Sequence, residues 1–224
     1  MNKALSFVRL DYITVKPYLT LKNLFIFLAV AVIMVINSGS SASAIGILMV
    51  YAALYVSYPF AVGEKNGIDA LYTTLSIKRN TVVLGRYLFA LTVDVCSGLL
   101  AYVFSFVIML MLRKEFNAGE AFLVTLIMLL VFSVVQAIQL PIYFKLGYAK
   151  AKFIAYLPFF CLPLATVAAT SLLRNVLSVN QITVLLEWLV ANTFIMVLLG
   201  IALWLAIVII SFLMSLKYYN KREL

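Results

Sequence analysis

The residue types that carry out most enzyme chemistry are scarce in this sequence, and histidine is absent. Histidine is the commonest general base near neutral pH and the commonest metal ligand, so its absence argues against a zinc protease. A serine or aspartyl protease needs a paired catalytic partner, yet Asp94 is the only acid well inside an apolar run. No Gly-x4-Gly-Lys-Ser/Thr loop for phosphate occurs either. We therefore expect a chain that is not an enzyme and holds no metal or cofactor of its own.

Five polar side chains interrupt long apolar runs and are candidates for a translocation path: Asp94, Gln136, Gln139, Thr166 and Thr170. A charge at the centre of a bilayer costs about 2.5–3.5 kcal/mol, so such groups should face a cavity or a polar partner. Gln136 and Gln139 are three residues apart and share one helix face. For Asp94 a structural pair between helices is an equally open interpretation. For the threonines, a hydrogen bond to the preceding helical turn is the commoner outcome.

The elements that must position these residues are transmembrane helices. The chain of 224 residues is 66% hydrophobic and 11% charged, whereas soluble domains are roughly 45–50% apolar and about 25% charged. Crossing a bilayer takes about 20 apolar residues. Six runs qualify, the first of them short, and they cover Leu21–Ile36, Ala44–Val62, Thr81–Leu112, Ala121–Phe144, Phe153–Leu173 and Trp188–Leu216. The sequence therefore predicts an all-α, polytopic membrane protein whose residues 1–224 form a single transmembrane domain.

The distribution of positive charge predicts the orientation. With the N-terminus inside, the inner segments hold all Lys and Arg residues of the 17 except Arg113, Lys114 and Arg174. Such an excess marks the cytoplasmic side. We expect a multi-pass protein of the plasma membrane with both termini in the cytoplasm. The net charge of +9 lies in short clusters between apolar runs, without the continuous basic face that nucleic-acid binding needs.

Two segments outside the crossings have helical patterns. In residues 1–20, Leu5, Val8, Tyr12 and Val15 recur on one face, which predicts a basic amphipathic helix against the lipid of the inner leaflet. A simple anchor that sets the topology is equally open. Residues 63–80 form a cytoplasmic loop in which Asn66 is a good N-cap and an apolar stripe follows, made of Ile68, Leu71, Tyr72 and Leu75. This stripe must pack on lipid, on its own protein or on a partner.

The same loop resembles a known family. Its sequence Glu64-Lys65-Asn66-Gly67-Ile68-Asp69-Ala70-Leu71-Tyr72, followed by Leu75, Arg79 and Arg86-Tyr87, resembles the first cytoplasmic loop of ABC-2-type transporter permeases. The segment Leu10-Asp11-Tyr12 is similar to the N-terminal segment of that family, and Ser76 departs from its usual proline. Among its members, permeases of exporters of phenol-soluble modulins, which are amphipathic peptide toxins, are the most similar that we can name.

The resemblance implies a homodimer in which the loop helix of each copy docks into one of two cytoplasmic ATPase subunits. ATP and magnesium would then bind to the ATPase, and an amphipathic or hydrophobic peptide would be exported. Carried onto this sequence, the resemblance makes the following residues candidates for coupling to the ATPase: Glu64, Lys65, Asp69, Leu71, Tyr72, Leu75 and Arg79. A non-pumping immunity or channel protein that sequesters a peptide in the membrane is the alternative.

Overall fold

The computed structural model of the chain describes residues 3–68, 72, 77–176, 181, 183–184, 187–188 and 191–222. Within these residues the structure is helical and has no strand, which confirms the all-α prediction. The elements are α1 (Lys3–Val15), the short 3-10 helix η1 (Lys16–Tyr18), α2 (Leu21–Ser38), α3 (Ser41–Tyr55), α4 (Tyr58–Lys65), α6 (Arg79–Met111), α7 (Ala118–Leu146), α8 (Tyr148–Val176) and α10 (Thr193–Lys221).

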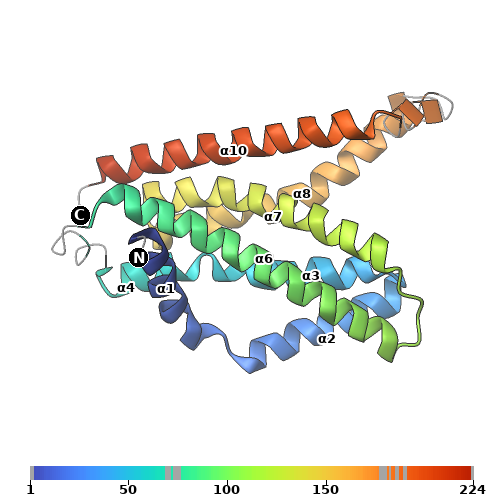
Figure 1. Ribbon diagram of the computed structural model, residues 1–224, viewed down its shortest axis with the longest axis horizontal. Coiled ribbons are helices and arrows are strands. Elements are labelled where there is room, and N and C mark those ends of the chain that lie inside the picture. The colour runs from blue at the N-terminus through green and yellow to red at the C-terminus, as the bar shows by residue number, and fades with distance from the viewer. Residues whose placement is uncertain are drawn as a thin grey trace.

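The long helices form an elongated bundle with α6 and α7 along its middle (Figure 1). Small and medium side chains of α2 and α3, among them Ala31, Val35, Ala44 and Ile45, are fully buried in the main apolar cluster. Helix α10 lies along one side of the bundle, and the second half of α8 diverges from α7 and the rest of the bundle (Figure 1). The described side chains of that half are largely exposed, as at Phe160 and Leu164.

Local sequence explains where several helices begin and end. Thr20, Ser40 and Asn117 each accept a hydrogen bond from a backbone N–H in the first turn of the helix that follows, as N-cap residues do. Helix α2 ends at Gly39, whose φ of 72° is in the left-handed region that glycine adopts without strain. These two signals close the tight turn between α2 and α3.

The observed helices match the expected crossings, except that the second one is interrupted. The third run is one helix of 33 residues, α6, about 50 Å long and longer than the hydrocarbon core. The second run is divided into α3 and α4 at Val56 and Ser57, just before Pro59, because proline has no N–H to continue the ladder. The described residues contain five helices that are long and apolar enough to cross a membrane. The fifth run lies in α8, which is not one of them, so the count of six stays a prediction.

Helix α1 packs on α6 through a face that coincides only in part with the expected one, since Val8 and Val15 pack there and Tyr12 does not. Phe7, Asp11 and Val15 are 4%, 1% and 2% exposed, whereas Tyr12, expected on the apolar face, is 55% exposed. The buried face therefore has an i, i+4, i+8 spacing and includes the acid. Gly85 of α6 permits the close approach, because a Cβ there would lie 2.6 Å from the Phe7 ring.

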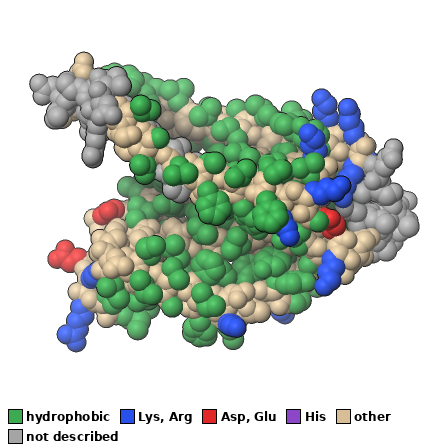
Figure 2. Space-filling model, turned by 180° about the vertical axis from the view of Figure 1, so that it is seen from behind, with side chains coloured by type: hydrophobic (Ala, Val, Ile, Leu, Met, Phe, Trp, Pro, Cys, Tyr) green, Lys and Arg blue, Asp and Glu red, His purple; other side chains and the backbone are tan. Residues whose placement is uncertain are grey.

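The two ends of the bundle differ in charge. Figure 2 shows Lys and Arg side chains gathered toward the end of the molecule at which α10 ends, with hydrophobic side chains over the middle. At the opposite end, the Lys114 ammonium donates hydrogen bonds to the Val35 and Ile36 carbonyl oxygens at 2.6 and 3.3 Å. A cation there stabilises the last turn of α2, where carbonyls lack partners within the helix.

Candidate functional site

The loop expected to couple to an ATPase begins at the C-terminus of α4. Asn66 is the C-cap of α4, with its N–H bonded to the Val62 carbonyl, and Gly67 follows with a φ of 62°. Asn66 thus ends α4, as Asn followed by Gly often does; the helix that it was expected to start lies largely outside the described residues, so that role stays a prediction. Asp69, Leu71 and Leu75 lie outside the described residues.

Glu64 caps the N-terminus of α8. Its Oε2 accepts hydrogen bonds from the backbone N–H groups of Tyr148, at 2.5 Å, and Ala149, at 3.1 Å. The first N–H groups of a helix have no partner within it and carry partial positive charge, so a carboxylate is stabilising there. Gly147 precedes this turn with a φ of 75°, and a Cβ on it would lie 2.9 Å from the same oxygen. The glycine thus leaves room for the Glu64 carboxylate. Lys65, the next residue and another of those expected to couple to the ATPase, is exposed.

Arg79 has the complementary role at the C-terminus of α10. Its Nη1 donates to the carbonyl oxygens of Tyr219, at 2.9 Å, and Asn220, at 2.6 Å. Its guanidinium also lies 5.9 Å from the centre of the Tyr219 ring. A cation at a helix C-terminus satisfies the last carbonyls and interacts favourably with the helix dipole. Glu64 and Arg79 flank the loop, so the loop is bonded on one side to α8 and on the other to α10.

The described part of the expected apolar stripe packs on the protein itself. Tyr72 is 4% exposed, and its ring centre lies 5.1 Å from that of Phe7 in α1. Ile68 and Ile77 pack against the same apolar cluster, which also contains Tyr219 of α10. Tyr72 is thus an internal contact between the loop and α1.

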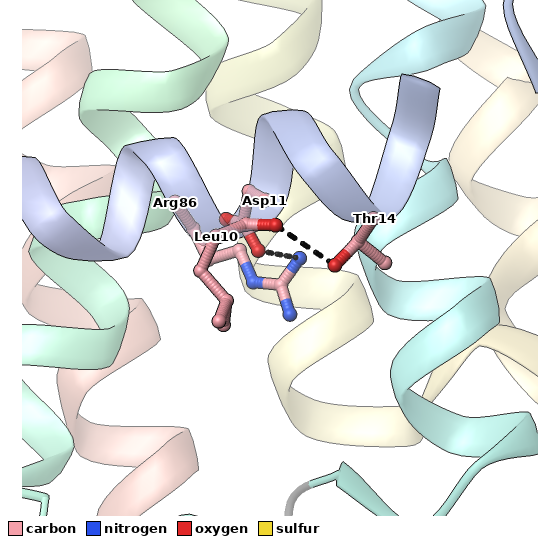
Figure 3. A network of polar contacts seen from close by, with 4 residues as sticks. All are labelled: Leu10, Asp11, Thr14 and Arg86. Atoms are coloured by element: carbon pink, nitrogen blue, oxygen red, sulfur yellow. Dashed lines mark hydrogen bonds and ion pairs between the residues drawn. The ribbon is translucent and has the colours of Figure 1, made fainter. Parts of the chain in front are cut away.

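A buried ion pair joins α1 to α6 beside this cluster. The Arg86 Nη1 lies 3.0 Å from Asp11 Oδ1, and both side chains are at most 5% exposed (Figure 3). The guanidinium also lies 4.7 Å from the centre of the Phe60 ring in α4. Burial raises the pKa of Asp11 to about 6, and the Arg86 charge opposes that rise. Arg86 therefore ties three elements together near the basic end.

The polar residues predicted for a translocation path are brought together only in part. Gln136 Nε2 of α7 donates to Asp94 Oδ1 of α6 at 2.6 Å, and both residues are buried. Gln139 faces α8 instead, donating to the Ala155 carbonyl oxygen at 2.8 Å. These bonds give partners to both amide Nε2 atoms and to one oxygen of Asp94, which would be costly to bury alone. The other oxygen, Oδ2, is buried without a hydrogen-bond partner among the described residues. Both amides therefore join helices, and a role in a path stays a prediction.

A small cavity of about 30 Å³ adjoins Asp94 and Gln136. Ser133 of α7 and Trp204 of α10 also line it, and the Trp204 indole donates to the Ser133 hydroxyl. Thr170 donates to the Val167 carbonyl of its own helix, which is the local bond expected of many threonines. The Thr166 side chain lies outside the described part of the chain.

A buried hydroxyl network was missed by sequence reasoning. Pro141, inside α7, has no N–H, so the Ala137 carbonyl lacks its usual donor and accepts from Ser211 of α10 at 2.5 Å. Because Ser211 uses its single proton there, the Tyr87 hydroxyl is the donor to Ser211 Oγ, and Ser215 donates in turn to Tyr87. The network joins α6, α7 and α10. The sequence feature that could have indicated this network is Pro141 within an apolar run, because a proline inside a helix leaves one carbonyl without its donor.

The described residues contain no group of three or more His, Cys, Asp or Glu residues that could hold a metal ion. The features that stand out are therefore the bonds around the loop and the polar contacts between crossings. They join helices to one another.

Comparison with known proteins agrees with this membrane architecture. The model of a family described as ABC-2 family transporter protein matches residues 6–220. No curated protein and no solved structure matches the sequence. The family match covers nearly the whole chain, including the membrane-spanning helices and the loop between α4 and α6. The chain is thus a membrane protein that belongs to the ABC-2 family of transporter proteins.

Proposed function

We propose that this chain is the permease subunit of an ATP-driven exporter of amphipathic peptides, and that a separate cytoplasmic ATPase binds ATP and magnesium and supplies the energy. One observation carries the proposal: the loop between α4 and α6 is flanked by Glu64, bonded to α8, and Arg79, bonded to α10. Membership of the ABC-2 family implies a partner ATPase in general. Residues 63–80 are the segment that the resemblance assigns to docking.

The two bonded ends give a physical route from a docked ATPase to the crossings. A displacement of the loop pulls on the Glu64 carboxylate, which holds the first turn of α8, and on the Arg79 guanidinium, which holds the last turn of α10. Hydrogen bonds to charged groups contribute about 1.5–3 kcal/mol each, enough to bias two arrangements of a helix pair. A movement of the ATPase on ATP hydrolysis would then shift α8 and α10 together.

Two copies of the chain and two ATPase subunits form the transporter in this proposal. Few helices make a thin wall around a path for a peptide, so a second copy completes it. The diverging second half of α8, with Phe160, Leu164 and Val167 each at least 66% exposed, offers a surface for such a copy (Figure 1). The clustering of basic residues at one end supports a plasma-membrane orientation with both termini in the cytoplasm. The peptide class of substrate rests on the resemblance.

The test is purification of the full-length tagged chain with its ATPase, followed by reconstitution into vesicles. We expect an ATPase polypeptide with a phosphate-binding loop to copurify, and an amphipathic helical peptide to be moved only when ATP is present. Changing Leu71 and Leu75 to Asp should abolish assembly, because a charge in an apolar docking contact is not compensated. Met111→Asp is the matched control, since Met111 is 77% exposed at the opposite end of α6.

Two results would overturn the proposal. One is peptide transport by the chain without any ATPase. The other is intact ATPase assembly after both leucines are changed. Peptide retained in the vesicle membrane with no ATP-dependent movement would instead support the non-pumping immunity or channel function.

A further inference from the structure

An apolar groove lies between α7, α8 and α10, toward the basic end of the molecule. It encloses about 470 Å³, within the 300–1,000 Å³ of typical ligand pockets. Its floor is formed by buried small side chains, Ala137, Pro141 and Ser211. We call it the α7–α10 groove. None of the coupling or path residues lines it, although its floor is the outer side of the hydroxyl network that Ala137, Pro141 and Ser211 form.

The walls of the α7–α10 groove are exposed aliphatic side chains. Ile138 of α7, Ile154 of α8, and Ile210 and Met214 of α10 are between 41% and 58% exposed, although all are apolar. The side chains of the floor are small. Pro141 has no backbone N–H, so the Ala137 carbonyl lacks its usual donor, and Ser211 of α10 donates to it across the floor. A slot of this composition fits a hydrocarbon chain.

The length of the groove matches one leaflet. On α10 its lining extends from Ile207 to Tyr218, about 16 Å at 1.5 Å per residue. Half of the hydrocarbon core of a bilayer is about 15 Å. An acyl chain from the leaflet at the basic end would therefore fill the groove and end near the middle of the membrane.

One cation, Lys145, is among the described residues that line the groove. Lys145, in the last turn of α7, lines the groove, and its Nζ lies 5.1 Å from the centre of the Tyr218 ring. Among the described residues, no carboxylate forms an ion pair with Lys145. If the groove spans one leaflet, the ammonium and the phenol hydroxyl lie at the depth of the lipid headgroups, which suits both Lys and Tyr.

We propose that the α7–α10 groove binds one acyl chain of an acidic phospholipid of the inner leaflet, whose phosphate pairs with Lys145. The ammonium should raise the affinity for acidic lipids over neutral ones, because only a headgroup with net negative charge neutralises it. The bound chain would fill the space between α10 and the rest of the bundle and hold α10 against α7. This inference does not depend on export or on an ATPase.

The experiment uses the purified full-length chain in detergent, without any ATPase. Phosphatidylglycerol and phosphatidylcholine with identical acyl chains are added together, and the retained lipid is measured by native mass spectrometry. We expect phosphatidylglycerol to be retained roughly five- to tenfold more than phosphatidylcholine. Lys145→Gln should bring the ratio close to one. Lys150→Gln is the matched control, because Lys150 is an exposed lysine near the start of α8 that does not line the groove, and it should keep the preference.

Three results would overturn the assignment: equal retention of the two lipids by the unchanged chain, a preference that survives Lys145→Gln, or a loss of preference in Lys150→Gln of the same size. A disulfide between copies through Ile210→Cys in native membranes, with Cys96 and Cys161 changed to Ser, would also overturn it. That crosslink would show that a second copy, not lipid, covers the groove. A correctly folded Lys145→Gln variant is verified by its unchanged thermal unfolding in lipid-free detergent.

Discussion

At Asp11, burial and charge act in opposite directions on one carboxyl group. The side chain is almost fully buried against α6, which disfavours the carboxylate, while Arg86 at 3.0 Å favours it. The effect of burial is the larger, so the pKa is raised from 3.8 to about 6. The folded protein therefore holds this proton more tightly than the unfolded chain does.

A pH dependence of stability follows from that shift. A raised pKa in the folded state contributes stability that is present below about pH 4 and is lost as the pH rises to about 6. We expect the difference in melting temperature between the unchanged chain and Asp11→Asn to decrease from pH 4 to pH 6 and to stay constant above pH 7. A difference that grows with pH would mean that the ion pair with Arg86 outweighs burial.

At the scale of elements, the contact of α1 with α6 depends on the absence of a side chain at Gly85. A Cβ there would lie 2.6 Å from the Phe7 ring, and Phe7 is buried, so the ring cannot swing aside. Gly85→Ala should therefore destabilise the α1 contact by about 1–3 kcal/mol. The melting temperature should fall, and trypsin should cleave faster after Arg9.

Gly98→Ala is the control for this prediction, on the same helix. Its added Cβ would be 3.5 Å from the nearest atom, in Thr125, which is ordinary contact. Alanine is also the better helix former by about 0.5–1 kcal/mol, so this variant should be neutral or slightly more stable. Equal losses in the two variants would show that the α1 contact does not depend on Gly85.

The α1 helix also shows how far the sequence allows prediction. A helix over these residues was predicted correctly, because its apolar residues recur at helical spacing. Its buried face was predicted only in part: Val8 and Val15 pack as expected, but Asp11 takes the place expected of Tyr12. Only its partner Arg86, which lies 75 positions away in the sequence, makes that acid a buried residue. A local pattern contains no information about such a distant partner. The expected orientation of the termini needs no such information, because it rests only on counting Lys and Arg in the segments between crossings.

At the scale of the whole molecule, the roles of the loop residues likewise depend on contacts that are distant in the sequence. The sequence and the resemblance drew attention to Glu64 and Arg79 as part of one loop. Their hydrogen bonds reach residues 84 and 140 positions away, in α8 and α10. No spacing within the loop predicts those contacts. The structure accordingly makes these two residues candidates for transmitting movement to the crossings, a role distinct from contacting an ATPase.

Transmission and docking lead to different outcomes when the two residues are changed. If Glu64 and Arg79 transmit movement, Glu64→Ala and Arg79→Ala should leave ATPase binding and ATP hydrolysis intact in reconstituted vesicles. Peptide moved per ATP hydrolysed should fall by about tenfold or more, as the loss of a charged hydrogen bond of about 1.5–3 kcal/mol would cause. Lys65→Ala, an exposed neighbour, should behave like the unchanged chain. Loss of ATPase binding in step with loss of transport would assign the two residues to the docking surface instead. The bonds to α8 and α10 would then be contacts that stabilise the basic end of the bundle and carry no movement.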